Sequence, residues 1–414
     1  MFISKQTFRT AFKTFKDEGV TGFLIKSLEF VRKSRTRKSN SQKHRISLLV
    51  KYDDLIKVDL SSPPVVDKNP KIGSLVINWL MPPPGKGSGG HMNIFRFIQY
   101  AEKAGHECRI YLYADGGKGS VQPVLDDIGS SYPETEAVKT MTWLDQREMD
   151  EADILFATSW QTAYAVYNST LSARRFYFVQ DFEPYFFPTG SLYSLAENTY
   201  KFGFYGVTAG GWLAKKLRGE YDMETDHFDF GADESLYSYK TTGNRNEIFF
   251  YARPYTARRG FELGIVALTI FHKKHPEYTI NLAGSDVSEY EIPFPYNNLK
   301  TLEPHELNNL YNKCAAGLVL SLTNMSLLPL ELLSSGTIPV VNSGENNRLV
   351  SNNPYIAYTD NTPLALANKL SEIVERNDLP GYALAASKSI PNSSWDSSGK
   401  KFVSILEREM GKEL

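Results

Sequence analysis

The sequence predicts an α/β protein made of two doubly wound, Rossmann-like domains that face each other across a cleft. Its length of 414 residues is more than one hydrophobic core usually serves, so two domains are expected. Short apolar runs alternate with helical patterns, which is typical of a parallel sheet covered by helices on both faces. The alternation stops at the polar stretch 237–246 and then starts again. Ligands of such folds bind at the carboxyl ends of the strands.

The first series of elements belongs to an expected N-terminal domain over residues 46–240. Each expected strand is a short apolar run, and each expected helix has apolar residues three or four positions apart. The expected strands are 72–80, 107–113, 137–142, 152–157, 174–180 and 204–208. The expected helices are 91–104, 120–129, 160–168, 191–202 and 211–218.

The second series belongs to an expected C-terminal domain over residues 241–390. Its expected strands are 247–252, 278–283, 316–321, 337–341 and 355–358. Its expected helices are 260–273, 304–313, 327–335 and 362–377. The last segment, 391–414, is expected to form a helix that returns to the N-terminal domain.

The composition is that of a soluble globular protein, with 42% hydrophobic and 22% charged residues. Two cysteines, Cys108 and Cys314, cannot build a disulfide framework or a cysteine-rich metal site, which suits a reducing cytoplasm. No apolar run approaches the roughly 20 residues of a membrane span. The sequence therefore predicts a cytoplasmic protein.

The first 45 residues are strongly basic. They hold twelve lysines and arginines against three carboxylates, which leaves a charge of +9, whereas the whole chain carries −1. Phe8, Phe12 and Phe15 recur at helical spacing with basic residues between them, and the polar run 32–45 is typical of a linker. Such a helix either contacts a membrane surface or packs its phenylalanine face on its own domain. Nucleic acid is not expected as a partner, because the remainder of the chain is acidic.

The glycine-rich stretch MPPPGKGSGGH, residues 81–91, contains the G-x-G-x-x-G spacing of dinucleotide-binding loops. That interpretation is disfavoured, because three prolines separate the expected strand from the first glycine and cannot donate a backbone N–H. Gly89 and Gly90 are instead expected to open a helix whose free amides, with His91, line the cleft. A dinucleotide site and a simple surface loop remain the alternatives.

Three arginines follow the expected strand 247–252 in a short loop that ends at a helix. Arginines beside a helix N-terminus offer both charge and a planar fork of donors to an anion. The loop therefore predicts an anion site that includes Arg253, Tyr255, Arg258 and Arg259.

A polar turn follows the expected strand 316–321, and an apolar helix comes next. The backbone amides of this turn are expected to bind a phosphate. Glu331 is costly in so apolar a helix unless a partner such as a sugar hydroxyl pairs with it. The residues expected to bind here are Thr323, Asn324, Met325, Ser326, Leu327 and Glu331.

These two segments resemble the nucleotide-sugar half of the retaining GT-B glycosyltransferases of family 4. The first family motif, G-R followed by K-G, corresponds to Ala252-Arg253 and Arg259-Gly260 with one extra residue between them. In the second motif, E-x7-E, Glu331 matches the second glutamate and is followed by a Pro-Val-Val ending at 339–341. Thr323 replaces the first glutamate, which puts the sugar contacts in doubt.

The resemblance implies a GT-B fold in which the N-terminal domain holds the acceptor and the C-terminal domain holds a nucleotide sugar, without a metal cofactor. The chain also looks like a rhamnosyltransferase of S-layer glycan assembly, which implies dTDP-β-L-rhamnose as donor and a lipid-linked oligosaccharide as acceptor. The enzyme would then work at the inner face of the cell membrane. Arg253 and Arg259 are the expected catalytic cations, because charge that develops on the leaving phosphate needs fixed donors.

Two other hypotheses stay open. Asp181 and Glu183 form a D-x-E after an expected strand, as in GT-A transferases that bind a metal through such carboxylates. The favoured interpretation places both carboxylates in the acceptor and sugar cleft. A two-domain sugar-binding protein without catalysis is the other alternative.

Overall fold

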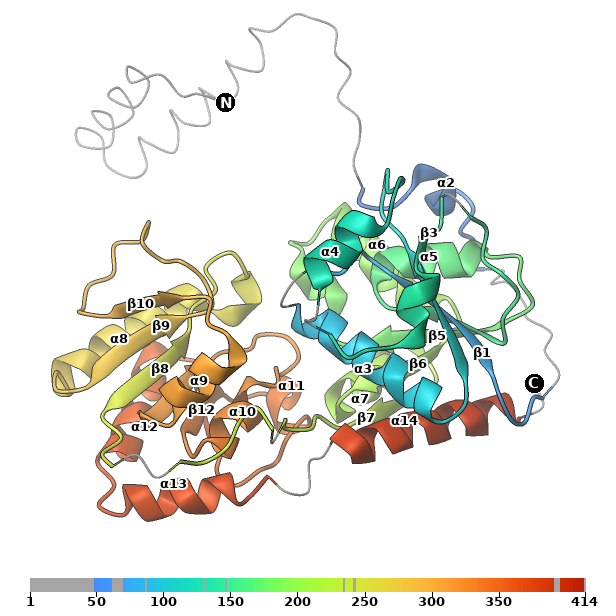
Figure 1. Ribbon diagram of the computed structural model, residues 1–414. Helices are drawn as coiled ribbons and strands as arrows, with labels where there is room; N and C mark the ends of the chain where they lie inside the picture. The colour runs from blue at the N-terminus through green and yellow to red at the C-terminus, as the bar shows by residue number, and fades with distance from the viewer. Residues whose placement is uncertain are drawn as a thin grey trace, which may run out of the picture. The chain divides into compact units, whose positions relative to one another are not determined.

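The computed structural model describes residues 48–61, 70–85, 88–129, 132–145, 147–233, 235–240, 243–390 and 395–412 (Figure 1). Their strands form two parallel sheets, one of seven strands and one of six. Helices cover both faces of each sheet, so the predicted α/β class with two doubly wound domains is confirmed.

The first sheet has the strand order β3-β2-β1-β4-β5-β6-β7. β1, an interior strand between β2 and β4, consists of VINWLM and is buried along nearly its whole length, as expected for a parallel sheet covered on both faces. The strands are β1 (Val76–Met81), β2 (Glu107–Leu112), β3 (Thr142–Trp143), β4 (Ile154–Ala157), β5 (Arg174–Val179), β6 (Tyr205–Ala209) and β7 (Thr225–Phe228).

The helices of this domain divide between the two faces of the sheet. The helix after β1 contacts β2 and the C-terminal helix, whereas those after β4, β5 and β6 form a second group. They are α2 (Tyr52–Leu55), α3 (Gly89–Lys103), α4 (Gln122–Ile128), α5 (Trp160–Asn168), α6 (Ser191–Asn198) and α7 (Gly211–Tyr221), with the 3-10 turns η1 (Glu136–Thr140), η2 (Glu183–Phe186) and η3 (Thr199–Lys201).

The expected strand 137–142 is wrong for most of its length. Residues 136–140 form the 3-10 turn η1, and only Thr142–Trp143 pair with β2. The carboxylate of Glu102 accepts hydrogen bonds from the amides of Glu136 and Ala137, at 2.9 and 2.8 Å, and so caps the turn. A side chain distant in sequence thus outweighs the local apolar pattern.

The second sheet has the order β10-β9-β8-β11-β12-β13. Its central pair consists of β8, with the sequence EIFFY, and β11, with the sequence CAAGLV. Most of their side chains are buried. The strands are β8 (Glu247–Tyr251), β9 (Thr279–Ala283), β10 (Asn297–Lys300), β11 (Cys314–Val319), β12 (Ile338–Asn342) and β13 (Ala357–Thr359).

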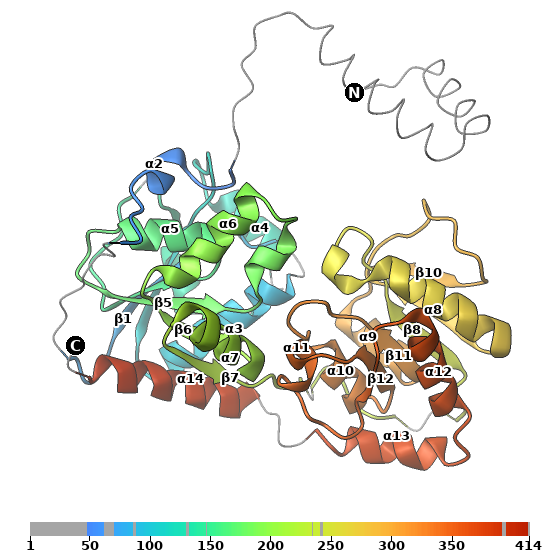
Figure 2. The same ribbon diagram turned by 180° about the vertical axis from the view of Figure 1, so that it is seen from behind.

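Figure 2 shows α8 and α12 side by side on this domain, where the two helices contact each other. Helix α10 packs on β11 and β12, and α13 packs on α10 in turn. The helices are α8 (Phe261–Lys274), α9 (Pro304–Tyr311), α10 (Leu328–Ser334), α11 (Glu345–Arg348), α12 (Pro363–Val374) and α13 (Leu379–Ser387), with the 3-10 turn η4 (Ala257–Arg259).

The last helix, α14 (Trp395–Met410), packs on α3 and β7 of the first domain (Figure 1). Phe402 is fully buried there, with its ring 5.0 Å from Phe97 and 6.0 Å from Trp79. Gly399 faces Tyr100 so closely that a Cβ would lie 2.3 Å from the ring, so only glycine fits. Helix α14 therefore shares one core with β1 and α3 of the first domain.

Several predictions concern residues outside the described ranges. The basic segment 1–45, with its expected helix and linker, is one of them, and Lys86 and Gly87 of the glycine-rich stretch are others. Cys108 and Cys314 are both buried and free. None of the described helices combines the length and the apolar character that crossing a membrane requires.

Candidate functional site

Two loops meet at the carboxyl edge of the second sheet. One follows β8 and contains η4, and the other follows β11, its neighbour in the sheet. The amide of Leu322 donates to the carbonyl of Arg258 at 2.9 Å, and an Arg259 guanidinium nitrogen donates to Ser321 Oγ at 2.7 Å. The sequence predicted these two loops as one anion site, and the geometry brings them together.

Gly260 sets the shape of the arginine loop. It has a φ of +56°, ends η4 and stands directly before α8, a conformation that favours glycine over any other residue. This turn leaves Arg258 and Arg259 half-buried beside each other. Burial lowers the pKa of the Arg259 guanidinium, and the nearby carboxylate of Asp181 works against that effect.

Arg253 lies at the same edge but approaches from the β9 side. Its guanidinium donates to the carbonyl of Gly284 at 3.3 Å and lies over the ring of Tyr251. Tyr255 is 75% exposed and interacts with Tyr290. It does not join the arginine cluster, so the geometry gives no support to its predicted place in the site.

A set of asparagines that was not among the predicted site residues holds the second loop. The backbone of Ser321 donates to Asn342 Oδ1 at 2.8 Å, and its carbonyl accepts from Asn342, Asn346 and Asn347. The stretch NSGENN, residues 342–347, was the available signal, because it begins at the last residue of β12, which neighbours β11 in the sheet.

The turn 323–327 offers fewer free amides than predicted. The amide of Asn324 donates to Asp181 at 2.9 Å, and that of Met325 donates to the carbonyl of Asn346 at 3.2 Å. Met325 is a buried core residue. In contrast, Asn324 Oδ1 and Ser326 Oγ are buried and have no hydrogen-bond partner among the described residues. Such orphan groups are rare and fit a site that awaits a polar ligand.

Glu331 lies in the first turn of α10, half-buried, as the predicted carboxylate in an apolar helix. The pKa of Glu331 is raised to about 7: burial and then the carboxylate of Asp233 raise it, whereas Arg96 and the hydroxyl of Tyr237 lower it. The group thus has one hydroxyl partner and a second acid beside it, which leaves capacity to accept from ligand hydroxyls.

Asp181, after β5 of the first domain, is held by the second domain. Its Oδ1 accepts from the amide of Asn324 at 2.9 Å, its Oδ2 accepts from the hydroxyl of Thr323 at 2.9 Å, and Oδ2 lies 3.4 Å from Arg258 Nε. Its side chain is only 12% exposed. The predicted cleft residue thus joins the predicted phosphate turn directly.

Glu183 is a correction to the predicted cleft. Its side chain is buried inside the first domain, where it accepts from the amide of Trp160 at 2.8 Å and from the hydroxyl of Tyr177 at 3.1 Å. This burial raises the pKa of Glu183 to about 7. Glu183 therefore anchors the start of α5, and the two carboxylates of D-x-E serve different partners.

Gly89, Gly90 and His91 begin α3 as predicted, with Ser88 as its cap. The ring of His91 donates from Nε2 to the carbonyl of Pro82 at 3.1 Å and lies 2.9 Å from Ser88 Oγ through Nδ1. Burial lowers its pKa, so the neutral ring fastens the proline-rich loop to the helix.

Gln180 connects α3 to the Asp181 loop, a role the sequence analysis did not assign. Its side chain donates to the carbonyl of Gly90 at 3.0 Å and accepts from Asn93 at 3.1 Å. Its backbone carbonyl accepts from Asn324 Nδ2 at 3.0 Å. The start of α3 and the phosphate turn are therefore linked through residues 180 and 181.

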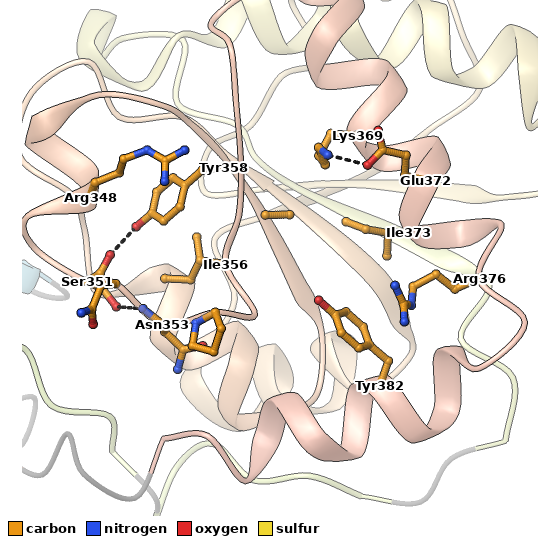
Figure 3. Close-up of a pocket in the computed structure, with 13 residues that line it drawn as sticks. Arg348, Ser351, Asn353, Ile356, Tyr358, Lys369, Glu372, Ile373, Arg376 and Tyr382 are labelled. Atoms are coloured by element: carbon orange, nitrogen blue, oxygen red, sulfur yellow. Dashed lines mark hydrogen bonds and ion pairs between the residues drawn. The ribbon is translucent and has the colours of Figure 1, made fainter.

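A hollow of about 450 Å³ lies elsewhere in the second domain, beside β13 (Figure 3). Its rings are covered, since Arg348 lies over Tyr358 and Arg376 lies over Tyr382. Lys369 is paired with Glu372, and Arg376 is also paired with Asp378. None of the predicted site residues lines this hollow.

Comparison with protein families gives two matches. Residues 143–208 match the WsaF N-terminal domain, and residues 246–371 match the WsaF C-terminal domain. The O-antigen biosynthesis protein RfbC of Myxococcus xanthus is 29% identical over 334 residues, which cover 77% of this chain. The matched region makes up only 26% of that relative's own length.

Solved structures share the fold at low identity. TarM of S. aureus superimposes with a TM-score of 0.63 at 8% identity, over 80% of this chain and 99% of TarM. Sucrose-phosphate synthase from Thermosynechococcus elongatus gives 0.59 at 10% identity, over 81% and 98% of the two chains. Both have the GT-B fold. The hypothesis of a GT-A transferase, which has a single sheet domain and would bind a metal through D-x-E, is therefore excluded. Two segments of the chain therefore resemble the WsaF domains, the N-terminal one before the C-terminal one, and the chain has a GT-B fold.

Proposed function

We propose that this chain is a glycosyltransferase that moves a sugar from a nucleoside diphosphate to a growing cell-surface polysaccharide. One observation carries the proposal: Arg258 and Arg259 meet the polar turn after β11 at the carboxyl edge of the second sheet. A GT-B fold, the two WsaF domain matches and the likeness to an O-antigen biosynthesis protein support it.

The donor we propose is dTDP-β-L-rhamnose, in line with the likeness to WsaF and with the rhamnosyltransferase resemblance of the sequence. Two of the similar structures, TarM and an α-glucosyltransferase, are complexes with UDP. The nucleotide would lie on the second domain, with its sugar hydroxyls near Glu331, whose carboxylate has spare acceptor capacity.

The chemistry would rest on fixed positive charge. Cleavage of the sugar–phosphate bond builds negative charge on the leaving diphosphate, and preorganised donors stabilise that charge in the transition state. Arg259, fixed by its bond to Ser321, and Arg253, at the end of β8, would supply these donors. Retention of anomeric configuration is proposed on the family resemblance alone.

The same proposal needs no metal ion. The carboxylate of Glu183 is buried and already accepts from Trp160 and Tyr177, so D-x-E does not offer a pair of carboxylates to a metal. Transfer is therefore expected to persist in EDTA. Loss in EDTA with recovery in manganese would contradict this part of the proposal.

The acceptor we propose is a lipid-linked oligosaccharide, reached at the inner face of the cell membrane through the basic segment 1–45. The first domain would bind it near Gly89 and Gly90, which lie exposed at the start of α3. The non-catalytic alternative, a sugar-binding protein, predicts binding of the nucleotide sugar without turnover.

The test is the rate of donor cleavage and transfer in Arg253→Ala and Arg259→Ala. Each is expected to lower kcat about 100-fold or more, as loss of one transition-state donor does. Arg376→Ala is the matched control, because this arginine lies in the hollow beside β13 and should leave kcat unchanged. Near-normal kcat in both folded variants would move the leaving-group site elsewhere.

A further inference from the structure

The carboxylate of Asp181 sits among groups that recognise phosphate oxygens. A backbone amide, a hydroxyl and a guanidinium surround it, from Asn324, Thr323 and Arg258. Charge-assisted donors of these kinds form anion sites in proteins. The second domain therefore offers an anion position that is filled from within the chain.

The neighbouring charges agree with this picture. Arg259 interacts electrostatically with Asp181, and its guanidinium is fixed by Ser321, whose hydroxyl in turn donates to the carbonyl of Asn324 at 2.6 Å. One carboxylate thus balances two half-buried arginines. A diphosphate bound by those arginines would meet a like charge at short range unless Asp181 moved away.

The backbone around Asp181 is tied down as well. Asn324 Nδ2 donates to the carbonyls of Gln180 and Ala209, at 3.0 and 2.8 Å, so the turn is also hydrogen-bonded to the ends of β5 and β6. The guanidinium of Arg258 lies 4.2 Å over the ring of Phe186. The contact between Asp181 and the turn is therefore part of a larger set of bonds that joins the two sheets.

We propose that Asp181 is an internal stand-in for one phosphate oxygen of the donor: it occupies the anion position of the 323–324 turn and is displaced when the nucleoside diphosphate binds. This inference rests on the proposed function. It assigns Asp181 a role in setting donor affinity rather than in holding the acceptor. A carboxylate of the protein that competes with the nucleotide lowers the apparent affinity for the nucleotide, because the nucleotide binds only to those molecules in which the anion position is free.

The test is calorimetric titration of the full chain with dTDP and, separately, with inorganic pyrophosphate. Asp181→Asn keeps the size of the side chain but removes its charge, and Asp181→Ala removes the group. Both are expected to lower Kd about tenfold relative to the unchanged protein. Asp286→Asn is the control, because Asp286 bonds to Ser288 and Asn298 in the same domain, and the change should leave Kd unchanged.

The outcomes separate this inference from the proposed function. An unchanged or raised Kd in a folded Asp181 variant, checked by its melting temperature, would overturn the inference while leaving the nucleotide site intact. A raised Kd would mean that Asp181 positions the hydrogen-bond donors of the anion site for the nucleotide instead of competing with the nucleotide for them. If neither the unchanged protein nor any variant binds dTDP or pyrophosphate, the proposed function fails and takes the inference with it.

Discussion

Glu183 shows how a single residue can carry a functional pattern and a structural role. Its position two residues after Asp181 suggested a shared cleft, yet its carboxylate is buried against the amide of Trp160 and the hydroxyl of Tyr177. Side-chain direction within a loop is set by packing, which a spacing of two residues does not encode. The arginine loop, by contrast, could be recognised as a candidate site from its residue types, because arginines and a glycine at the end of a strand have few purely structural uses.

The same burial predicts a pH effect on stability. The pKa of Glu183 is raised from 4.5 to about 7 in the folded protein, so the folded state holds the proton more tightly than the unfolded chain. The free energy of unfolding should therefore fall as pH rises from about 4.5 to about 7, by up to roughly 3 kcal/mol from this group, and level off above.

Glu183→Gln should remove that component. The free energy of unfolding of both proteins is measured in urea at several pH values. Between pH 5 and pH 8 the value for Glu183→Gln is expected to rise relative to that of the unchanged protein. Glu224→Gln, at an exposed position, is the control and should follow the unchanged protein. A parallel pH dependence in Glu183→Gln would show that the carboxylate is ionised in the fold at little cost.

At the level of elements, the buried strands were the most predictable part of the molecule. β1, β5, β8 and β11 consist mainly of apolar residues, and their positions differ from expectation by a few residues at most. The edge strands β7 and β10 were missed because TDHF and NNLK are polar and short. These two strands form because each pairs with a neighbouring strand, and no local sequence pattern predicts that pairing.

Helix α14 gives the prediction at this scale. Phe402 is fully buried among the aromatic rings of the first domain, so Phe402→Ala should lower the free energy of unfolding by about 3–5 kcal/mol. Lys400→Ala, on the exposed side of the same helix, should change it by less than about 0.5 kcal/mol. Denaturant unfolding measures both, and equal effects would mean that α14 contributes little to this core.

For the whole molecule, the two-domain plan followed from the restart of the strand-helix alternation near residue 246, and it is confirmed. The direct bonds from Asp181 to the turn 323–324 could not be predicted, since they join residues more than 140 positions apart in the sequence. Thr323, which departs from the family motif, makes one of these bonds. A residue that weakened the resemblance thus has a physical role of its own.

The basic segment 1–45 carries the next prediction. If it holds the protein at a membrane, each lysine or arginine near an anionic surface contributes on the order of 1 kcal/mol. Deleting residues 1–45 should abolish binding to anionic liposomes, and high salt should weaken binding of the full chain. Turnover on a short soluble acceptor should survive the deletion. Unfolding of the shortened protein would instead mean that the phenylalanine face belongs to the core.

The central claim is that the second domain binds a nucleoside diphosphate at the arginine loop and the turn after β11. The most direct test is the melting temperature of the full chain with dTDP, UDP or NAD, because a ligand bound at 100 times its Kd stabilises the fold by about 2.7 kcal/mol. We predict a rise with dTDP or UDP that is lost in Arg259→Ala, and no rise with NAD. A rise with NAD and none with either pyrimidine nucleotide would contradict the account.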